Sequence, residues 1–373
     1  MVFALWLMAL GTSGAQALEL TRGRLMAGGE ARTYLLLRPE GSSGPLPVVI
    51  ALHGAAQSAQ GFRDYFGLDA AAAAHGFVAV YPQGEGRVWN DSRPAAMRLK
   101  AVLRPGDDVA FLVALVHRLV AEGIADPARI YLTGISNGGF MVERMACEQA
   151  QLFAAFSVIM ATAPANAREE CRPSRAVPIL FIHGTADAVI AYSGFWTPMG
   201  ATLSAPDSAA LFARLNDCGP ASTRNLPDLD PLDGTSVTER SWDSCRDGSV
   251  VRLLSVERGG HQSPARVETK PDLATPFLGL RNHDIDAGEE VWAFMSAFTL
   301  AAPVLSGPAG VAPAAGPMGG QLPAQTNGVL SGRGVVPLPV PSPLRARSAP
   351  PAGQRSSLER EGGPWSQRGI STQ

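Results

Sequence analysis

The sequence has little charge of either sign. Among its 373 residues, 31 are Lys or Arg and 33 are Asp or Glu, which gives a formal net charge of −2. Such a balance predicts neither the basic surface that nucleic acids require nor a strongly acidic one, so we expect no nucleic-acid partner. The hydrophobic fraction of 46% is nevertheless sufficient for a sizeable core.

Metal-binding and redox motifs are also missing. The four cysteines form no Cys-x-x-Cys pair, which argues against a zinc ribbon or a thioredoxin-like centre. The six histidines form no His-x-x-x-His pair, and Gly84-Glu85-Gly86 is too incomplete for a nucleotide-binding loop. We therefore expect no metal site and no cofactor.

Long hydrophobic runs are confined to the N-terminus. Residues 2–10 are apolar, and Ala15-Gln16-Ala17 fits the small-x-small pattern of a cleavage site before Leu18. The run is too short to span a bilayer comfortably, and no later segment offers an uninterrupted one. We expect residues 1–17 to be a signal peptide, with a buried N-terminal element as the alternative. The mature protein is then secreted or periplasmic, without a membrane span.

Aromatic residues are scarce after residue 301. Pro, Gly, Ala and Ser dominate residues 302–373, and this composition cannot bury enough apolar surface to offset the entropy of ordering. We expect a disordered tail there, with a surface-adhering linker as the alternative. The folded domain is then residues 18–301, and it contains no evident internal repeat.

Within that domain, apolar strand-like runs alternate with helical patterns. Strands are predicted at residues 32–37, 47–52, 77–81, 130–134, 153–160, 177–182 and 250–256, and helices at residues 62–74, 107–121, 138–149 and 284–298. Apolar strands separated by helices indicate a mostly parallel, doubly wound sheet with helices on both faces. Such a sheet places its functional site at the carboxyl ends of the strands.

One turn in this pattern carries a nucleophile motif. The segment Gly134-Ile135-Ser136-Asn137-Gly138 fits G-x-S-x-G, with a predicted strand before it and a predicted helix after it. The turn strains the serine backbone, and the helix N-terminus offers N–H groups to a developing oxyanion. We predict an α/β-hydrolase fold with Ser136 as nucleophile. The alternative is a Gly-rich turn without chemistry.

A serine hydroxyl needs a base, and in this fold the chain order is Ser, acid, His. Three histidines follow Ser136 in the sequence: His183, His261 and His283. We assign His261 as the base, because it lies in the loop after the predicted strand at residues 250–256. His183 is interpreted as a strand-end residue that is hydrogen-bonded to backbone, and His283 as a cap or surface residue.

The other catalytic groups are predicted from their positions just after predicted strands. Asp187 lies just past a predicted strand, where the acid belongs. The oxyanion hole needs an N–H from the loop after the third strand, which predicts Ala55 together with Asn137. His53 is expected to support this loop through hydrogen bonds. Trp89 is predicted to line the substrate cleft, with a packing role as the alternative.

The four cysteines are an even set in a chain with an export signal, which favours disulfides over free thiols. The sequence permits three pairings. We favour the sequential one, Cys147 with Cys171 and Cys218 with Cys245, because it closes two short loops.

Several segments together resemble the secreted polyhydroxybutyrate depolymerase and feruloyl esterase family. They are residues 47–57 (PVVIALHGAAQ), 107–118 (DDVAFLVALVHR), 126–148 (DPARIYLTGISNGGFMVERMACE), 177–192 (VPILFIHGTADAVIAY) and Gly259-Gly260-His261. The resemblance implies an α/β-hydrolase without a large lid domain, with residues 18–301 as the catalytic domain. It also implies Ser136, Asp187 and His261 as the triad, and it makes Cys147 and Cys218 family positions.

The chain departs from this family at two places. Ala55 stands where the family often has Cys, and His261 is followed by Gln262-Ser263-Pro264 rather than by Thr or Ser and Trp-Pro. The missing Trp removes a wall of the substrate cleft, so the preference among hydroxyalkanoate, acetyl and feruloyl esters stays open.

We expect a monomeric, secreted serine carboxylester hydrolase that works through an acyl-enzyme. The alternatives are a serine peptidase on the same fold and a non-catalytic exported binding protein.

Overall fold

The computed structural model describes residues 16–91, 93, 106–197, 200–267 and 275–301. Of the predicted signal peptide, only Gln16 and Ala17 are among these residues, and the predicted tail lies outside them.

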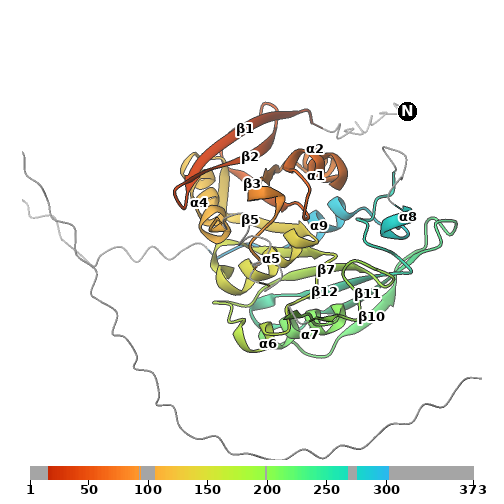
Figure 1. Ribbon diagram of the computed structural model, residues 1–373. Helices are drawn as coiled ribbons and strands as arrows, with labels where there is room; N and C mark the ends of the chain where they lie inside the picture. The colour runs from red at the N-terminus through yellow and green to blue at the C-terminus, as the bar shows by residue number, and fades with distance from the viewer. Residues whose placement is uncertain (1–15, 92, 94–105, 198–199, 268–274, 302–373) are drawn as a thin grey trace, which may run out of the picture. The chain divides into compact units, whose positions relative to one another are not determined.

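A ten-stranded mixed sheet lies at the centre of the described chain (Figure 1). Its order is β1-β2-β4-β3-β5-β6-β7-β12-β11-β10, and the six strands from β4 to β12 are mutually parallel. Antiparallel pairs extend both edges. The strands are β1 (Leu18–Ala27), β2 (Glu30–Pro39), β3 (Leu46–Leu52), β4 (Val78–Pro82), β5 (Ala125–Ile135), β6 (Ala155–Ile159), β7 (Ile179–Gly184), β10 (Ser222–Asn225), β11 (Ser236–Trp242) and β12 (Val251–Glu257).

Helices cover both faces of this sheet. Three of them pack on one face: α4 (Asp108–Ala121), α5 (Asn137–Glu148) and α7 (Ala205–Leu215). Three pack on the other: α1 (Ala59–Phe66), α2 (Leu68–His75) and α9 (Ala287–Met295). The short elements are η1 (Glu85–Arg87), η2 (Ala150–Leu152), α6 (Ala167–Glu170), η3 (Arg246–Gly248), α8 (Thr275–Leu278) and the small hairpin β8 (Trp196–Thr197) and β9 (Gly200–Ala201).

Strand β3 shows why both faces must be covered. Val48 and Ile50 face one core and Val49 and Ala51 face the other, and all four side chains are fully buried. An apolar residue at every position leaves no face for solvent. The predicted α/β-hydrolase fold, with a mostly parallel sheet between two helical layers, is confirmed. In the described residues no helix is long and apolar enough to cross a membrane.

The prediction differs from the structure at helix breaks and sheet edges. The predicted helix at residues 62–74 is two helices, because Gly67, with a φ of 78°, ends α1 and begins α2. The final helix starts only after Asp286, whose carboxylate caps it by accepting the N–H of Gly288 and of Glu289. The sequence patterns do not predict strands β1, β10 and β11. The residues of β1 and β10 are mostly exposed and carry no apolar pattern, and β11 (SVTERSW) has few apolar residues; all three pair by backbone hydrogen bonds.

Two disulfides join elements on the α5–α7 side of the sheet. Cys147 near the end of α5 is bonded to Cys171 after α6, and Cys218 after α7 is bonded to Cys245 before η3. This is the sequential pairing favoured above. The bonds close loops with sequence separations of 24 and 27 residues.

We expect the double variant Cys218→Ser/Cys245→Ser to lose about 3 kcal/mol of unfolding free energy, because the bond restricts the unfolded chain over 27 residues. Urea denaturation followed by circular dichroism measures the loss. The variant Cys147→Ser/Cys171→Ser should lose a similar amount, because its loop is of similar length. A loss well under about 1 kcal/mol in both variants would contradict the expectation.

Candidate active site

Ser136 occupies the sharp turn between β5 and α5. Its backbone has a φ of 55° and a ψ of −120°, a conformation that is rare for any residue with a side chain. The turn also brings Gly138 against β3, where a Cβ would lie 2.4 Å from the carbonyl oxygen of Leu52. Only glycine fits there. A strained serine at a strand-to-helix junction has the geometry of a nucleophile elbow.

Asp187 and His261 meet at the carboxyl ends of the parallel strands, in the loops after β7 and β12. Asp187 follows β7 and His261 follows its parallel neighbour β12. The Nδ1 atom of His261 lies 2.7 Å from Oδ2 of Asp187. The other carboxylate oxygen accepts the N–H groups of Val189 and Ile190, each at 2.8 Å. The buried carboxylate is therefore fixed in place and keeps the proton of His261 on Nδ1, which leaves Nε2 as an acceptor.

The loops of Asp187 and His261 are in direct contact. The N–H of Ala186 donates to the carbonyl oxygen of Gly259 at 2.9 Å. A Cβ on Gly184 would lie 2.3 Å from that same oxygen, so only glycine allows β7 to end here. The acid and the base are thus brought together by backbone packing as well as by their own hydrogen bond.

His183 is the penultimate residue of β7 and lies next to Asp187. Its Nε2 lies 2.8 Å from the carbonyl oxygen of Ile190 and 3.4 Å from Oδ2 of Asp187. Its Nδ1 lies 3.3 Å from the carbonyl oxygen of Ala161. Burial lowers the pKa of His183. These backbone contacts are those expected from the sequence for a strand-end histidine.

Ser136 and the Asp187–His261 pair follow the carboxyl ends of three parallel strands, β5, β7 and β12. The Oγ atom of Ser136 makes no hydrogen bond to any other residue that the structure describes. Catalytic hydrogen bonds in unliganded enzymes are often long and tighten only when substrate binds. Ser136 itself is half-buried.

The predicted oxyanion groups lie on two neighbouring elements. Ala55 is exposed in the loop after β3, and Asn137 is the first residue of α5, at the positive end of the helix dipole. Among the described residues, neither backbone N–H has an acceptor. Both donors can therefore serve a substrate oxygen.

His53 fixes the loop that carries Ala55. Its ring is buried, with Nδ1 at 2.8 Å from the carbonyl oxygen of Gly54 and Nε2 at 2.9 Å from the N–H of Gly84. Because the Gly84 N–H must donate, Nε2 is unprotonated and the proton lies on Nδ1. Burial lowers the pKa of His53. The supporting role predicted for His53 rests on these two contacts.

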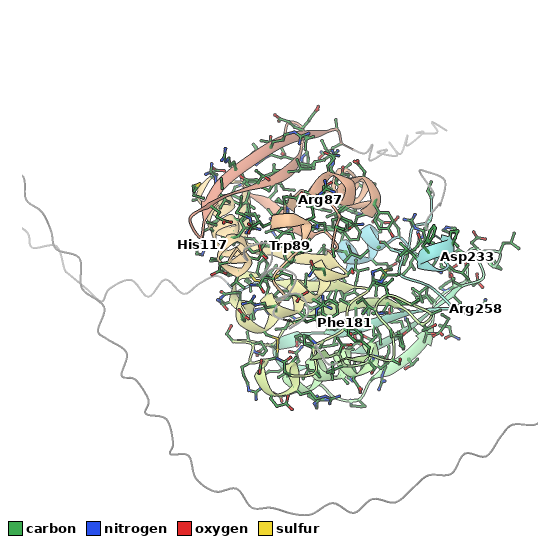
Figure 2. All side chains as sticks on the ribbon, viewed as in Figure 1. Arg87, Trp89, His117, Phe181, Asp233 and Arg258 are labelled. Atoms are coloured by element: carbon green, nitrogen blue, oxygen red, sulfur yellow. A yellow bond between two sulfur atoms is a disulfide. The ribbon has the colours of Figure 1, made fainter. Side chains whose placement is uncertain are left out.

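Trp89 is not a wall of the cleft, so that prediction is wrong and its packing alternative is right. The indole is 0% exposed in the interior of the domain (Figure 2). Its Nε1 donates to the carbonyl oxygen of His53 at 2.9 Å, and the two rings lie 5.0 Å apart. Trp89 thus helps to fix the loop that carries His53 and Ala55.

The side chain of Asn137 ties α5 to the segment that contains Trp89. Its Oδ1 accepts the N–H of Trp89 at 2.7 Å, and its Nδ2 donates to the carbonyl oxygen of Trp89 and, at 2.6 Å, to Asp91. Asp91 in turn forms an ion pair with Arg93 at 2.7 Å. Sequence reasoning assigned only the backbone of Asn137 and missed Asp91, because Trp-Asn-Asp carries no pattern that predicts such a link.

Gln262 stands at one of the positions where the chain departs from the resembling family. It is buried, and its Nε2 donates to Thr275 Oγ1 at 3.0 Å and to the carbonyl oxygen of Gly279 at 2.7 Å. The backbone N–H of His261 donates to the carbonyl oxygen of Leu278. The residue after the histidine therefore holds α8 against the histidine loop.

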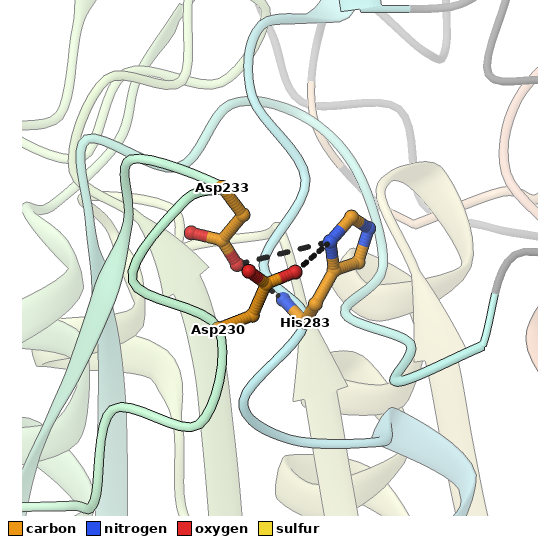
Figure 3. A group of neighbouring side chains, drawn as sticks. All are labelled: Asp230, Asp233 and His283. Atoms are coloured by element: carbon orange, nitrogen blue, oxygen red, sulfur yellow. Dashed lines mark hydrogen bonds and ion pairs between the residues drawn. The ribbon is translucent and has the colours of Figure 1, made fainter.

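A second group of titratable side chains comes from other loops: Asp230, Asp233 and His283 (Figure 3). The Nδ1 of His283 lies 3.4 Å from Asp230 and 3.9 Å from Asp233. The three side chains could offer ligand atoms to a metal ion, whereas the sequence led us to expect no metal site. The interpretation of His283 as a helix cap is wrong, because Asp286 caps α9. The spacing Asp228-x-Asp230-x-x-Asp233 is a sequence signal for the two carboxylates, but it contains no information about their contact with His283.

Comparisons with known proteins point to esterases. The family model described as "Esterase PHB depolymerase" matches residues 32–199, a range that includes Ser136 and Asp187 and ends before His261. The putative esterase NocK of Nocardia uniformis subsp. tsuyamanensis is 29% identical over 266 residues, covering 65% of this chain and 74% of the relative.

Two further relatives are matched over smaller parts of their length. Feruloyl esterase B of Piromyces equi is 26% identical over 249 residues, covering 62% of this chain and 42% of the relative. Poly(3-hydroxyalkanoate) depolymerase C of Paucimonas lemoignei is 31% identical over 121 residues, covering 31% of this chain and 28% of the relative.

We expect Trp89→Phe to lower the free energy of unfolding by about 1–3 kcal/mol, because the buried carbonyl of His53 loses its donor. Urea denaturation measures the change. Trp292→Phe is the control, because Trp292 stacks on Phe77 at 4.3 Å and keeps an aromatic ring there. An equal loss in both variants would mean that the hydrogen bond to His53 is unimportant.

The pKa of His53 in the folded protein is below its unfolded value of about 6.5, so the unfolded chain binds the proton more readily. The contribution of His53 to the free energy of unfolding is therefore complete above that value. It is lost as the pH drops below it, by at most about 1.4 kcal/mol per pH unit. Urea denaturation between pH 8 and pH 5, a range on either side of about 6.5, should show this slope.

The variant His53→Asn should have a shallower slope than the wild type. His183 contributes in the same direction, so part of the slope remains in this variant. An unchanged slope in His53→Asn would contradict the assignment.

Proposed function

We propose that the chain is a carboxylic ester hydrolase of the kind described by the Esterase PHB depolymerase family model, with Ser136, His261 and Asp187 as its nucleophile, base and acid. The observation that carries this proposal is the 2.7 Å contact between Asp187 and His261, at the sheet edge where Ser136 occupies its strained turn. The esterase relatives support ester hydrolysis as the reaction, and the geometry supports the roles of the three residues.

Catalysis proceeds by acyl transfer in two steps. The Nε2 of His261 takes the proton of Ser136 while the serine oxygen attacks the ester carbonyl. The N–H groups of Ala55 and Asn137 stabilise the oxyanion, which is more negative in the transition state than in the ester. His261 then donates its proton to the leaving alcohol, and water, activated by the same imidazole, releases the acid.

Asp187 affects both of these catalytic steps through His261. Its carboxylate is fixed by the N–H groups of Val189 and Ile190 and cannot follow the imidazole as the proton moves. It therefore holds the ring in one tautomer and stabilises the imidazolium that forms during each step. The links from Asn137 and His53 to Trp89 give the oxyanion donors a similarly fixed frame.

The substrates that we propose are short hydroxyalkanoate, acetyl or feruloyl esters. Relatives of the chain have names that include feruloyl esterase, acetylxylan esterase and poly(3-hydroxyalkanoate) depolymerase. We also propose that the enzyme works outside the cytoplasm, as a secreted or periplasmic protein. The two disulfides and the signal-like N-terminal pattern support this location.

We expect Ser136→Ala to lower kcat for ester hydrolysis about ten-thousandfold or more, because the nucleophile is lost. A panel of chromogenic acetate, butyrate and ferulate esters measures this activity and identifies the preferred acyl group. Ser157→Ala is a matched control, since Ser157 is a buried serine on β6 whose hydroxyl has no partner in the described structure.

Asp187→Asn should also lose most of the activity, because the amide no longer enforces the productive tautomer. Unchanged hydrolysis in Ser136→Ala would overturn the nucleophile assignment. Unchanged hydrolysis in Asp187→Asn alone would overturn only the assignment of the acid.

A further inference from the structure

The loop that carries His261 is bound by two side chains at a point two residues past the histidine. The N–H of Ser263 donates to the hydroxyl oxygen of Tyr65 at 2.7 Å. The carbonyl oxygen of Ser263 accepts from Nε of Arg281 at 2.8 Å. Ser263 is 0% exposed, so its backbone groups depend on these protein partners for their hydrogen bonds.

The two side chains that bind Ser263 also contact each other. The guanidinium carbon of Arg281 lies 5.1 Å from the centre of the Tyr65 ring, which is a cation–π contact. The three residues Tyr65, Ser263 and Arg281 therefore form a closed set of contacts, which we call the loop clamp. Loss of one member removes a hydrogen bond from the backbone of the histidine loop.

Tyr65 anchors this loop to the helix that follows the oxyanion loop. It lies in the last turn of α1, which begins four residues after Ala55 and is capped by the side chain of Ser58. The other end of α1 packs on α9 (Figure 1), where a Cβ on Gly288 would lie 3.0 Å from the backbone of Gly67. Helix α1 is thus fixed at both ends, and Tyr65 links the loop of an oxyanion donor to the loop of the base.

The other backbone contacts of the histidine loop come from a single segment. The N–H of His261 donates to the carbonyl oxygen of Leu278, and the N–H of Ala265 donates to that of Asn282 at 3.1 Å. Residues 278–282 and the histidine loop can therefore shift together. Tyr65 opposes such a shift because it belongs to a different element, α1.

The position of this loop decides where Nε2 of His261 points. The other ring nitrogen, Nδ1, is fixed at 2.7 Å from the carboxylate of Asp187. A displacement of the loop backbone consequently rotates the imidazole about that contact and moves Nε2, the atom that exchanges the proton. A misplacement of about 1 Å can lower a catalytic rate about a hundredfold.

We propose that Tyr65 is a positioning residue for His261, which holds the histidine loop so that Nε2 is aimed at the leaving oxygen of the ester. The inference rests on the catalytic roles proposed above and adds a residue to them. As the bond between the carbonyl carbon and the leaving oxygen breaks, the proton passes from Nε2 to that oxygen. An alkoxide requires this proton, whereas a nitrophenolate is a stable anion and leaves without it.

Ethyl and nitrophenyl esters of the same acyl group, the one that the wild type prefers, test the proposal. The ratio of their kcat/KM values compares acylation with and without the need for a placed acid. We expect Tyr65→Phe to lower kcat/KM for the ethyl ester roughly tenfold more than for the nitrophenyl ester. A smaller folded fraction would lower both values equally, so the ratio separates positioning from stability.

Tyr131→Phe is the matched control. Its hydroxyl donates to the carbonyl oxygen of Phe298 at 2.9 Å, a contact that involves no residue of the histidine loop. The ratio of the two kcat/KM values should therefore stay at its wild-type value in this variant. A change as large as that in Tyr65→Phe would overturn the proposal, because the effect would then not be specific to the loop clamp.

An unchanged ratio in Tyr65→Phe would also overturn the positioning role, while Ser136-dependent hydrolysis by the wild type would leave the proposed function standing. Hydrolysis of neither ester by the wild type would instead refute the proposed function, and the positioning role with it. Should Tyr65→Phe fail to fold, Arg281→Met decides, because it removes the donor to the carbonyl of Ser263. That variant must shift the ratio in the same direction, and an unchanged ratio would overturn the proposal.

Discussion

The register of the parallel strands sets the positions of all the candidate catalytic groups. Leu52 of β3 pairs with Gly134 of β5, Ile135 of β5 with Ile159 of β6, and Ile159 in turn with Ile182 of β7. The strands therefore end at one level, and the loops of Ala55, Ser136, Asp187 and His261 leave the sheet at the same edge. A shift of one residue in any pair would turn buried side chains to the opposite face, and the two apolar cores prevent such a shift.

Dense backbone packing at this edge both makes the site possible and restricts its sequence. The carbonyl oxygens of Leu52 and Gly259 would each lie closer than 2.5 Å to a Cβ on Gly138 or Gly184. The glycines of the elbow and of the strand ends are thus steric requirements of the fold. They allow the loops of nucleophile, acid and base to approach. Three non-glycine residues in the loops of this site, Ala56, Ser136 and Arg258, have positive φ angles and so carry conformational strain.

Buried polar groups then decide which parts of the site are rigid. Asp187 is satisfied by His261 and two backbone N–H groups, and Asn137, Trp89 and His53 form a connected network under the oxyanion loop. Such networks specify one arrangement when every member is paired. Glu143 is the exception on the same helix, because neither of its buried carboxyl oxygens has a hydrogen-bond partner in the described structure.

Local patterns were sufficient for the parallel strands, the elbow motif and the chain order of Ser136, Asp187 and His261. Each of these depends on residues that are neighbours in the sequence, or on a rule about strand ends that holds throughout such folds. The polar edge strand β1 had no such pattern, because its place comes from backbone pairing with β2. The burial of Trp89, the grouping of Asp230 with His283 and the unpaired state of Glu143 required the packed structure. Each depends on contacts between segments far apart in the chain, whose distances no local pattern encodes.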